Sequence, residues 1–200
     1  MIDATCQKIL DKVHDYAREN YIMILADECE VVLRRLFEEN SPKRVLEIGT
    51  AIGYSSSVMA LMSDCIIDTI EKDNERIKKA KELWKALGIE ERINSFEGDS
   101  KELLPQVVKD KIYDFIFIDG AKSSYKNQLE FLYPYLEKSG IVLCDDVLYL
   151  GLVRGQEKVI HKHRTIVKNM REFLDYIQNS NLFESTVFEE GNGIAVVRKK

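Results

Sequence analysis

Residues 44–71, "RVLEIGTAIGYSSSVMALMSDCIIDTIE", decide the fold. An apolar strand-like run comes first, followed by a turn with two glycines, a helical stretch that begins near Tyr54, and a second apolar run. Strands that are apolar along their whole length are buried on both faces, and helical connections between such strands are typical of parallel sheets. This stretch therefore predicts one strand–helix–strand unit of an α/β fold.

The chain after this unit repeats the alternation. Further strand-like runs lie at residues 92–99, 113–120 and 140–146. Further helical stretches begin near Asn74, Lys101 and Ser124. Strands that alternate with helices of this kind predict a parallel sheet covered by helices on both faces.

Both ends of the chain depart from the alternation. Helical spacing of apolar residues predicts two helices, within residues 6–17 and 25–40. At the other end, an amphipathic helix at 163–180 precedes "FESTVFEEGNGIAVVRKK", which predicts two strands joined by a turn at 190–193. We therefore expect an α/β fold with a doubly wound, mostly parallel, seven-stranded sheet and a C-terminal antiparallel hairpin.

Length and composition limit the remaining possibilities. A chain of 200 residues fits a single domain over 1–200, with N-terminal helices in 1–40 and an α/β core in 41–200. The net charge of −5 gives no overall attraction to nucleic acid. Four widely spaced cysteines without a C-x-x-C pair predict reduced thiols. Neither a secretion signal nor an apolar run of about 20 residues is present, so we expect a cytoplasmic protein that does not enter the membrane.

The turn after the first predicted strand, "LEIGTAIGYSS", points to a ligand. Gly49 and Gly53 permit a tight turn and a close approach of the backbone to a bound molecule. The dinucleotide pattern G-x-G-x-x-G is absent, and a carboxylate at Glu47 would repel a phosphate but suit a cationic group. We therefore expect a ligand that has a cationic group and no pyrophosphate.

Acidic turns also follow the second and third predicted strands. Glu71 ends the second strand about 20 residues beyond the glycine turn, where an acidic side chain is placed to hydrogen-bond ribose hydroxyls. Asp99 and Ser100 follow the third strand and are placed to meet an adenine. Ordinary loop polarity is the alternative at each turn. Three polar turns after three successive strands favour a nucleoside cofactor without phosphates.

These turns resemble those of the class I S-adenosylmethionine-dependent methyltransferases, which have a Rossmann-like fold. Their cofactor carries a sulfonium cation, an amino acid head and an adenosine, and the resemblance covers essentially the whole chain. It implies S-adenosyl-L-methionine as the cofactor. The implied contacts are Leu25, Glu47, Gly49, Gly53, Ser55, Glu71, Asp99, Ser100 and Asp119.

Carboxylates also follow the fourth and fifth predicted strands. Asp119 lies in "FIFIDGAKSSY", and the adjacent Asp145 and Asp146 end "GIVLCDD". Neighbouring carboxylates beside buried residues cost free energy unless a cation or strong donors offset their charge. Solvated turn residues are the alternative, but three hard oxygen ligands at matching strand ends suit Mg²⁺ or another divalent cation. We therefore predict a metal site at these three aspartates.

The segments "EIGTAIGYSS", "FIDGAKSSY" and "DDVLYLGLV" are similar to the catechol and caffeoyl-CoA type O-methyltransferases, a divalent-metal family that also implies a homodimer. That family usually has Asp-Asn where this chain has Asp145 and Asp146, and the extra charge should bind a cation more tightly. Lys122 matches the family's catalytic lysine, with a surface lysine as the alternative. Its implied role is to take or screen the proton of the acceptor hydroxyl if a nearby cation depresses the lysine's pKa.

The residues leave the methyl acceptor open. Chelation through two adjacent oxygens selects catechols, and equally a 5-hydroxyuracil ring. The segment 154–171, "RGQEKVIHKHRTIVKNMR", is basic apart from Glu157 and is suited to phosphate contacts, with a solvated helix face as the alternative. His161 and His163 lack the further partners that a metal pair would need.

From "DDVLYLGLV" to "GNGIAVVRKK" the chain resembles the bacterial tRNA 5-hydroxyuridine methyltransferases. They act on a modified wobble uridine in the anticodon loop, where bases are already unstacked. The chain departs from that branch at Met23, where a proline is usual, and at Leu25, where a methionine is usual. The resemblance implies tRNA as the substrate and 5-methoxyuridine as the product. The implied substrate contacts are Tyr149, Arg154, Lys162 and Arg164.

Two further functions remain as alternatives. One is an O-methyltransferase that acts on small molecules with two adjacent oxygens, of the catechol or caffeoyl-CoA kind. The other is a non-catalytic cofactor-binding protein, which the joint presence of Asp119, Lys122, Asp145 and Asp146 disfavours.

Overall fold

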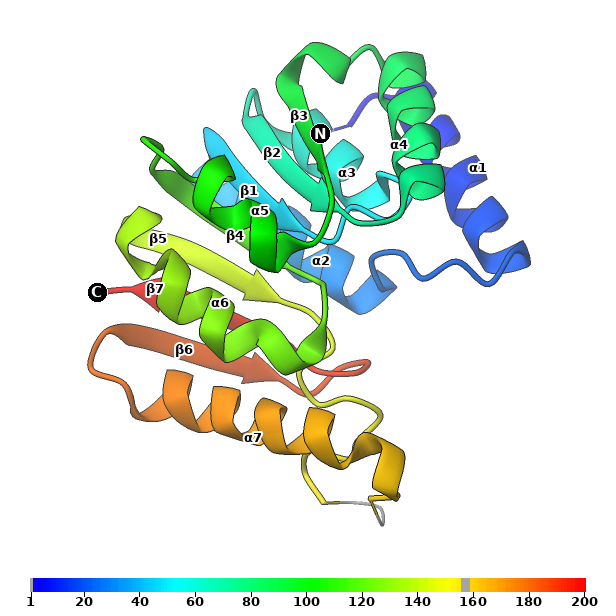
Figure 1. The fold of residues 1–200 in the computed structure, drawn as a ribbon. Coiled ribbons are helices and arrows are strands. Elements are labelled where there is room, and N and C mark those ends of the chain that lie inside the picture. The colour runs from blue at the N-terminus through cyan, green and yellow to red at the C-terminus, as the bar shows by residue number, and fades with distance from the viewer. Residues whose placement is uncertain (1, 156–158) are drawn as a thin grey trace. The chain divides into compact units, whose positions relative to one another are not determined.

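The computed structural model describes residues 2–155 and 159–200 (Figure 1). Its seven strands follow the order β3-β2-β1-β4-β5-β7-β6 in a mixed sheet. The chain divides into two compact units, Met1–Lys109 and Asp110–Lys200. The predicted single domain over residues 1–200 stays a prediction.

The first unit consists of two N-terminal helices followed by strands that alternate with helices. Its elements are α1 (Ala4–Glu19), α2 (Asp27–Asn40), β1 (Arg44–Ile48), α3 (Tyr54–Met62), β2 (Ile66–Glu71), α4 (Asn74–Leu87), η1 (Glu90–Arg92), β3 (Ile93–Glu97) and α5 (Ser100–Val107). The three strands pair in parallel, with Ile48 of β1 opposite Ile70 of β2. The turns that follow these strands therefore emerge at the same edge of the sheet.

Helix α2 is tied to the start of α3. The Tyr54 hydroxyl donates to Glu30 Oε2 over 2.9 Å, and Arg34 forms an ion pair with Glu30 Oε1 at 2.6 Å. Burial and the negative charge of Glu30 raise the pKa of Tyr54, which keeps the phenol protonated as a donor. These contacts hold α2 against the residue that begins α3, directly after the glycine turn.

The second unit contains a parallel strand pair and the C-terminal hairpin. Its elements are β4 (Tyr113–Ile118), η2 (Lys122–Ser124), α6 (Tyr125–Leu132), η3 (Tyr133–Tyr135), β5 (Leu136–Cys144), η4 (His161–His163), α7 (Arg164–Asn179), β6 (Phe183–Phe188) and β7 (Ile194–Lys199). β4 and β5 are parallel, whereas β7 is antiparallel to both β5 and β6. Helix α7 runs beside β6 (Figure 1).

The register of β4 and β5 brings their carboxyl ends together. Ile118 lies opposite Cys144, and the Asp145 amide donates to the Ile118 carbonyl over 3.2 Å. The residues that follow the two strands, Asp119 and Asp145, are therefore neighbours in space. This adjacency depends on strand pairing that no local sequence pattern specifies.

The predicted fold class is confirmed, including the parallel strands and the antiparallel C-terminal hairpin. One boundary differs clearly, because β5 begins at Leu136 and not near residue 140. Its early residues 137–139 are exposed and polar, so they carry no apolar signal. The described residues contain no helix that is both long enough and apolar enough to cross a membrane.

Candidate active site

The turn after β1 requires both of its predicted glycines. Gly49 and Gly53 have positive φ values of 102° and 83°, in a backbone region that residues other than glycine rarely adopt. A Cβ atom on Gly53 would also lie 2.8 Å from Ala80 Cβ and 2.9 Å from Trp84 Nε1 of α4. The turn therefore packs against α4 at van der Waals distance, and no larger residue fits at position 53.

Glu47 is fully buried at the end of β1 and is bound by hydroxyl groups. Ser55 Oγ donates to Oε1 and Thr69 Oγ1 donates to Oε2, each over 2.5 Å. These bonds connect the carboxylate to the first turn of α3 and to β2. In this arrangement Glu47 positions the glycine turn, and its contact with a cationic ligand group stays a prediction.

Glu71 is held at the same turn by backbone donors. Its Oε2 accepts from the Ala51 amide over 2.9 Å, and its Oε1 accepts from the Lys72 and Asp73 amides over 2.9 and 3.0 Å. A carboxylate has about four lone-pair sites, so Oε2 keeps capacity for a further donor such as a ribose hydroxyl. The structure thus brings Glu47, Gly49, Gly53, Ser55 and Glu71 together around one turn.

The remaining predicted cofactor residues of the first unit occupy different environments. Asp99 is exposed and caps α5, with Oδ1 accepting from the Lys101 amide over 2.8 Å. Ser100 is the first residue of α5, and the Gly98 amide before it donates to the Glu71 carbonyl over 2.9 Å. Leu25 is buried, with 3% of its surface exposed, just before α2. The cofactor contacts of these three residues stay predictions.

Lys122 lies between two of the three predicted metal ligands. Its Nζ is 3.0 Å from Asp119 Oδ1 and 2.9 Å from Asp146 Oδ2, and it also donates to the Tyr125 hydroxyl over 3.3 Å. Tyr125 in turn donates to the backbone carbonyl of Asp145 over 3.0 Å. Lys122 is therefore a partly buried member of an acidic cluster and not a surface lysine.

Burial and crowding of like charges shift the ionisation of this cluster. Burial raises the pKa of Asp145 to about 7, and the charges of Asp119 and Asp146 act in the same direction. Burial alone would lower the pKa of Lys122, but the two neighbouring carboxylates outweigh it, so the lysine pKa is raised. Without a metal Lys122 is thus a fixed ammonium group, and the depressed pKa of a general base would require a competing cation.

The chemistry of the cluster fits a metal, although its side chains are not arranged around one. As the side chains lie, residues 2–155 and 159–200 contain no group of three or more His, Cys, Asp or Glu side chains that could hold an ion. The donors nevertheless suit a hard cation, since two carboxylates already contact an ammonium group and the charge of Asp145 interacts with all three of these groups. The metal site stays a prediction, in which an ion replaces Lys122 as the partner of at least one carboxylate.

The hairpin turn supports the loop after Asp146. The sequence predicted the turn but did not indicate this contact. The Val147 amide donates to the Gly193 carbonyl over 2.9 Å, and the Leu148 amide donates to the Asn192 carbonyl over 2.7 Å. A Cβ atom on Gly193 would lie 2.2 Å from Leu148 Cγ. The available signal was "GNG", which predicted the turn but not the loop that packs against it.

The predicted substrate residues are spread along the chain after this loop. Tyr149 hydrogen-bonds through its hydroxyl to His163 Nδ1 over 3.0 Å, and Arg154 pairs with Glu189 at 3.2 Å. Lys162 is exposed in η4, and Arg164 is the first residue of α7. Glu157 and Lys158 of the predicted basic segment lie outside the described residues. Substrate contacts by these side chains stay predictions.

Comparison with known proteins gives consistent matches. A family model described as O-methyltransferase matches residues 3–200. An Arabidopsis thaliana protein provisionally named a caffeoyl-CoA O-methyltransferase is 32% identical over 171 residues, which cover 84% of this chain and 74% of that protein.

Solved structures give the same fold. A Staphylococcus aureus protein with the same provisional name is 31% identical, with a TM-score of 0.88 over 96% of this chain and 92% of its own. The S-adenosylhomocysteine-bound methyltransferase of Podospora anserina is 21% identical, with a TM-score of 0.83 over 100% of this chain and 89% of its own. At 21% identity the second likeness shows the fold alone.

Proposed function

This chain belongs to the O-methyltransferase family, and from that premise we propose that it methylates one of two adjacent oxygens on a small aromatic acceptor of the catechol or caffeoyl-CoA kind. It is an S-adenosylmethionine-dependent O-methyltransferase. The observation that carries the proposal is the cluster of Asp119, Lys122, Asp145 and Asp146, with its distances of 3.0 and 2.9 Å from the lysine.

The glycine turn supports binding of the methyl donor. Glu71 presents a carboxylate that three backbone amides hold in place, and Gly53 allows the backbone to pack closely. Glu47 keeps Ser55 and Thr69 in register behind the turn. The donor supplies an electrophilic methyl carbon, and the acceptor oxygen forms a bond to it as the carbon–sulfur bond breaks.

The acidic cluster supports binding of the acceptor. A divalent cation such as Mg²⁺ would be held by Asp119, Asp145 and Asp146, and when bound it supplies Lewis acidity that lowers the pKa of an acceptor hydroxyl. Lys122, which lies between Asp119 and Asp146, would place a positive charge close to that oxygen and stabilise its negative charge. Tyr125 holds both the lysine and the Asp145 backbone in place. Much of the rate acceleration would come from this fixed orientation.

A second acceptor, 5-hydroxyuridine in a tRNA anticodon loop, is favoured by the basic residues around α7. Arg154, Lys162 and Arg164 lie on the segment that follows residues 147–153, the loop after Asp146, which we call the acceptor loop. The named relatives support the small-molecule acceptor more directly than the RNA. The homodimer implied by the family resemblance remains a prediction.

The test is methyl transfer from labelled S-adenosylmethionine to three acceptors. They are caffeoyl-CoA, caffeic acid without coenzyme A, and an anticodon stem-loop RNA that carries 5-hydroxyuridine. We expect label in at least one dihydroxy aromatic acceptor, with loss of activity in EDTA and recovery with Mg²⁺. Label in the RNA alone would replace the first acceptor with the second. No label in any of the three, from a protein that binds the donor, would contradict the proposal.

A further inference from the structure

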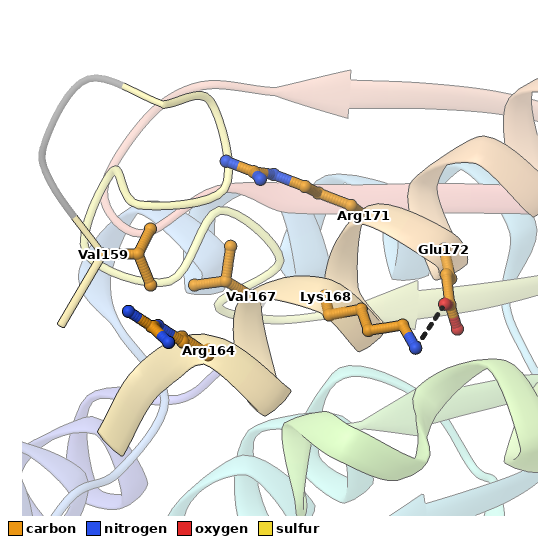
Figure 2. Close-up of a pocket in the computed structure, with 6 residues that line it drawn as sticks. All are labelled: Val159, Arg164, Val167, Lys168, Arg171 and Glu172. Carbon is orange, nitrogen blue, oxygen red and sulfur yellow. Dashed lines mark ion pairs between the residues drawn. The ribbon is translucent and has the colours of Figure 1, made fainter. Parts of the chain in front are cut away.

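A cavity of about 280 Å³ lies along one face of α7 in the second unit (Figure 2). Its lining combines apolar and cationic side chains. The lining residues are Val159, Arg164, Val167, Lys168, Arg171 and Glu172. The residues of the acidic cluster take no part in this lining, so the cavity is a separate feature of the unit.

The cations come from one face of the helix. Arg164, Lys168 and Arg171 are spaced by four and three residues, which places their side chains in one row on an α-helix. Figure 2 shows them around the two valines, of which Val167 is buried at 2% exposure. The cavity therefore offers an apolar floor with a cationic rim.

One of the cations is fixed in position. Arg171 donates from Nε to the Val153 carbonyl over 2.9 Å and from a terminal nitrogen to the Leu152 carbonyl over 3.2 Å. Carbonyl oxygens hold the guanidinium group but do not neutralise its charge. Arg171 therefore keeps a net positive charge in a defined place, which favours recognition of an anion.

The acidic residue of the lining compensates little of this charge. Glu172 Oε1 lies 3.7 Å from Lys168 Nζ, and the two side chains are 51% and 75% exposed. An ion pair of this length and exposure is weak. Three cations against one carboxylate leave the lining at a formal charge of +2, on a protein whose net charge is −5.

The cavity is joined to the loop that follows the acidic cluster. Arg171 binds the carbonyls of Leu152 and Val153, which lie on the loop that begins after Asp146. Tyr149 of the same loop bonds to His163, the residue directly before α7. An acceptor bound at the acidic cluster and a group bound in the cavity would therefore share one loop.

We propose that this α7 cavity binds a phosphate group of the methyl acceptor, with the apolar floor contacting the adjacent organic part. The inference rests on the proposed function for the identity of the acceptor. The phosphate belongs either to the coenzyme A portion of a thioester acceptor or to the backbone of an RNA. Both are organic phosphates, and an amphipathic cavity with cations on its rim suits either.

The test uses binding, so that it does not depend on methyl transfer. The probes are coenzyme A, followed by calorimetry, and a fluorescein-labelled anticodon stem-loop RNA, followed by anisotropy. The variant is Lys168→Glu, in which the replaced side chain is 75% exposed, so the substitution removes no buried packing. The control is Arg35→Glu on α2, since Arg35 and Glu39 have the same spacing and the same exposures of 75% and 51%.

We expect Lys168→Glu to weaken the binding of one probe by about tenfold or more. If that probe is the RNA, the slope of the logarithm of the binding constant against the logarithm of the salt concentration should also become smaller by about 1. Arg35→Glu should stay within about twofold of the unaltered protein. If coenzyme A binds more weakly, the phosphate belongs to the thioester acceptor. If the RNA binds more weakly, the phosphate belongs to the RNA backbone. The inference is overturned if neither probe binds the unaltered protein, or if Lys168→Glu behaves like Arg35→Glu.

A kinetic readout separates this inference from the proposed function. With caffeic acid, which has no phosphate, Lys168→Glu should leave both KM and kcat unchanged. With the phosphate-bearing acceptor it should raise KM and leave kcat nearly unchanged. Equal effects on both acceptors would contradict a phosphate site while leaving the methyltransferase activity intact.

Discussion

The close contact between Gly193 and Leu148 predicts how much stability the chain loses when Gly193 is replaced by alanine. Replacing Gly193 with alanine adds a Cβ atom 2.2, 2.7 and 2.8 Å from the Leu148 atoms Cγ, Cβ and Cδ1. Carbon atoms pack favourably only at about 3.5–4.0 Å, so Leu148 must move. Because Leu148 is 5% exposed and its amide binds the Asn192 carbonyl, the loop after Asp146 must move with it.

The expected loss in the free energy of unfolding has two contributions, one from the backbone and one from steric overlap. Gly193 has a φ of +85°, and holding a residue with a side chain in the left-handed region costs about 1–2 kcal/mol. Overpacking a buried contact costs about 1–3 kcal/mol. The free energy of unfolding should therefore fall by about 2–5 kcal/mol in Gly193→Ala, a large part of a typical stability. Displacement of the acceptor loop should also raise the acceptor KM.

The assay is urea denaturation, with Gly88→Ala as the matched control. Gly88 has a φ of +66°, and a Cβ atom added there would have no neighbour within 4 Å, so the control carries the backbone cost alone. The difference between the two variants measures the steric part, expected at about 1–3 kcal/mol. In the double variant Gly193→Ala with Leu148→Ala, some of the stability lost to steric overlap should be recovered. If Gly193→Ala costs no more than Gly88→Ala, the steric argument is refuted.

Three further predictions concern the site. Lys122→Met should lower turnover about 100-fold or more by removing the charge that stabilises the acceptor oxygen, whereas Lys126→Met on α6 should not; equal turnover of the two variants would exclude a role for Lys122. Asp146→Asn removes one negative charge and should raise the Mg²⁺ concentration for half-maximal activity; an unchanged metal titration would place the ion elsewhere. Glu71→Gln should weaken donor binding by about tenfold in calorimetry, because a neutral amide accepts fewer of the bonds that the turn and the ligand donate; unchanged binding would remove Glu71 from the donor site.

Several features of the site could be predicted from short stretches of sequence, because they depend on only a few neighbouring residues. Gly49 and Gly53 stand where the backbone needs positive φ, and this requirement belongs to the residue itself. Glu71 ends an apolar strand of the first unit, and Asp119 and Asp145 directly follow apolar strands of the second. Polar residues at the carboxyl ends of parallel strands are a local signal of a ligand site. The strand alternation and the hairpin turn likewise depend on side-chain period and turn chemistry.

The surroundings of the side chains at those positions depend on tertiary packing. Glu47 is predicted to contact a ligand, and its register with β2 and α3 also places the Thr69 and Ser55 hydroxyls against its carboxylate, which no local pattern indicates. The pKa of Lys122 is raised because strand pairing puts Asp119 and Asp146 on either side of it. The order of residues along the chain gives the charge of each group but not the distances that set its pKa.

Local sequence is thus sufficient for the fold class, the glycine turn and the acidic residues at the strand ends. Only the folded chain reveals that Gly193 supports Leu148 and that Arg171 reaches back to the loop at Leu152 and Val153. Backbone preference and burial are encoded within a few neighbouring residues, so they can be inferred locally. Contacts between segments tens of residues apart depend on register and on close packing, which are established when the chain folds.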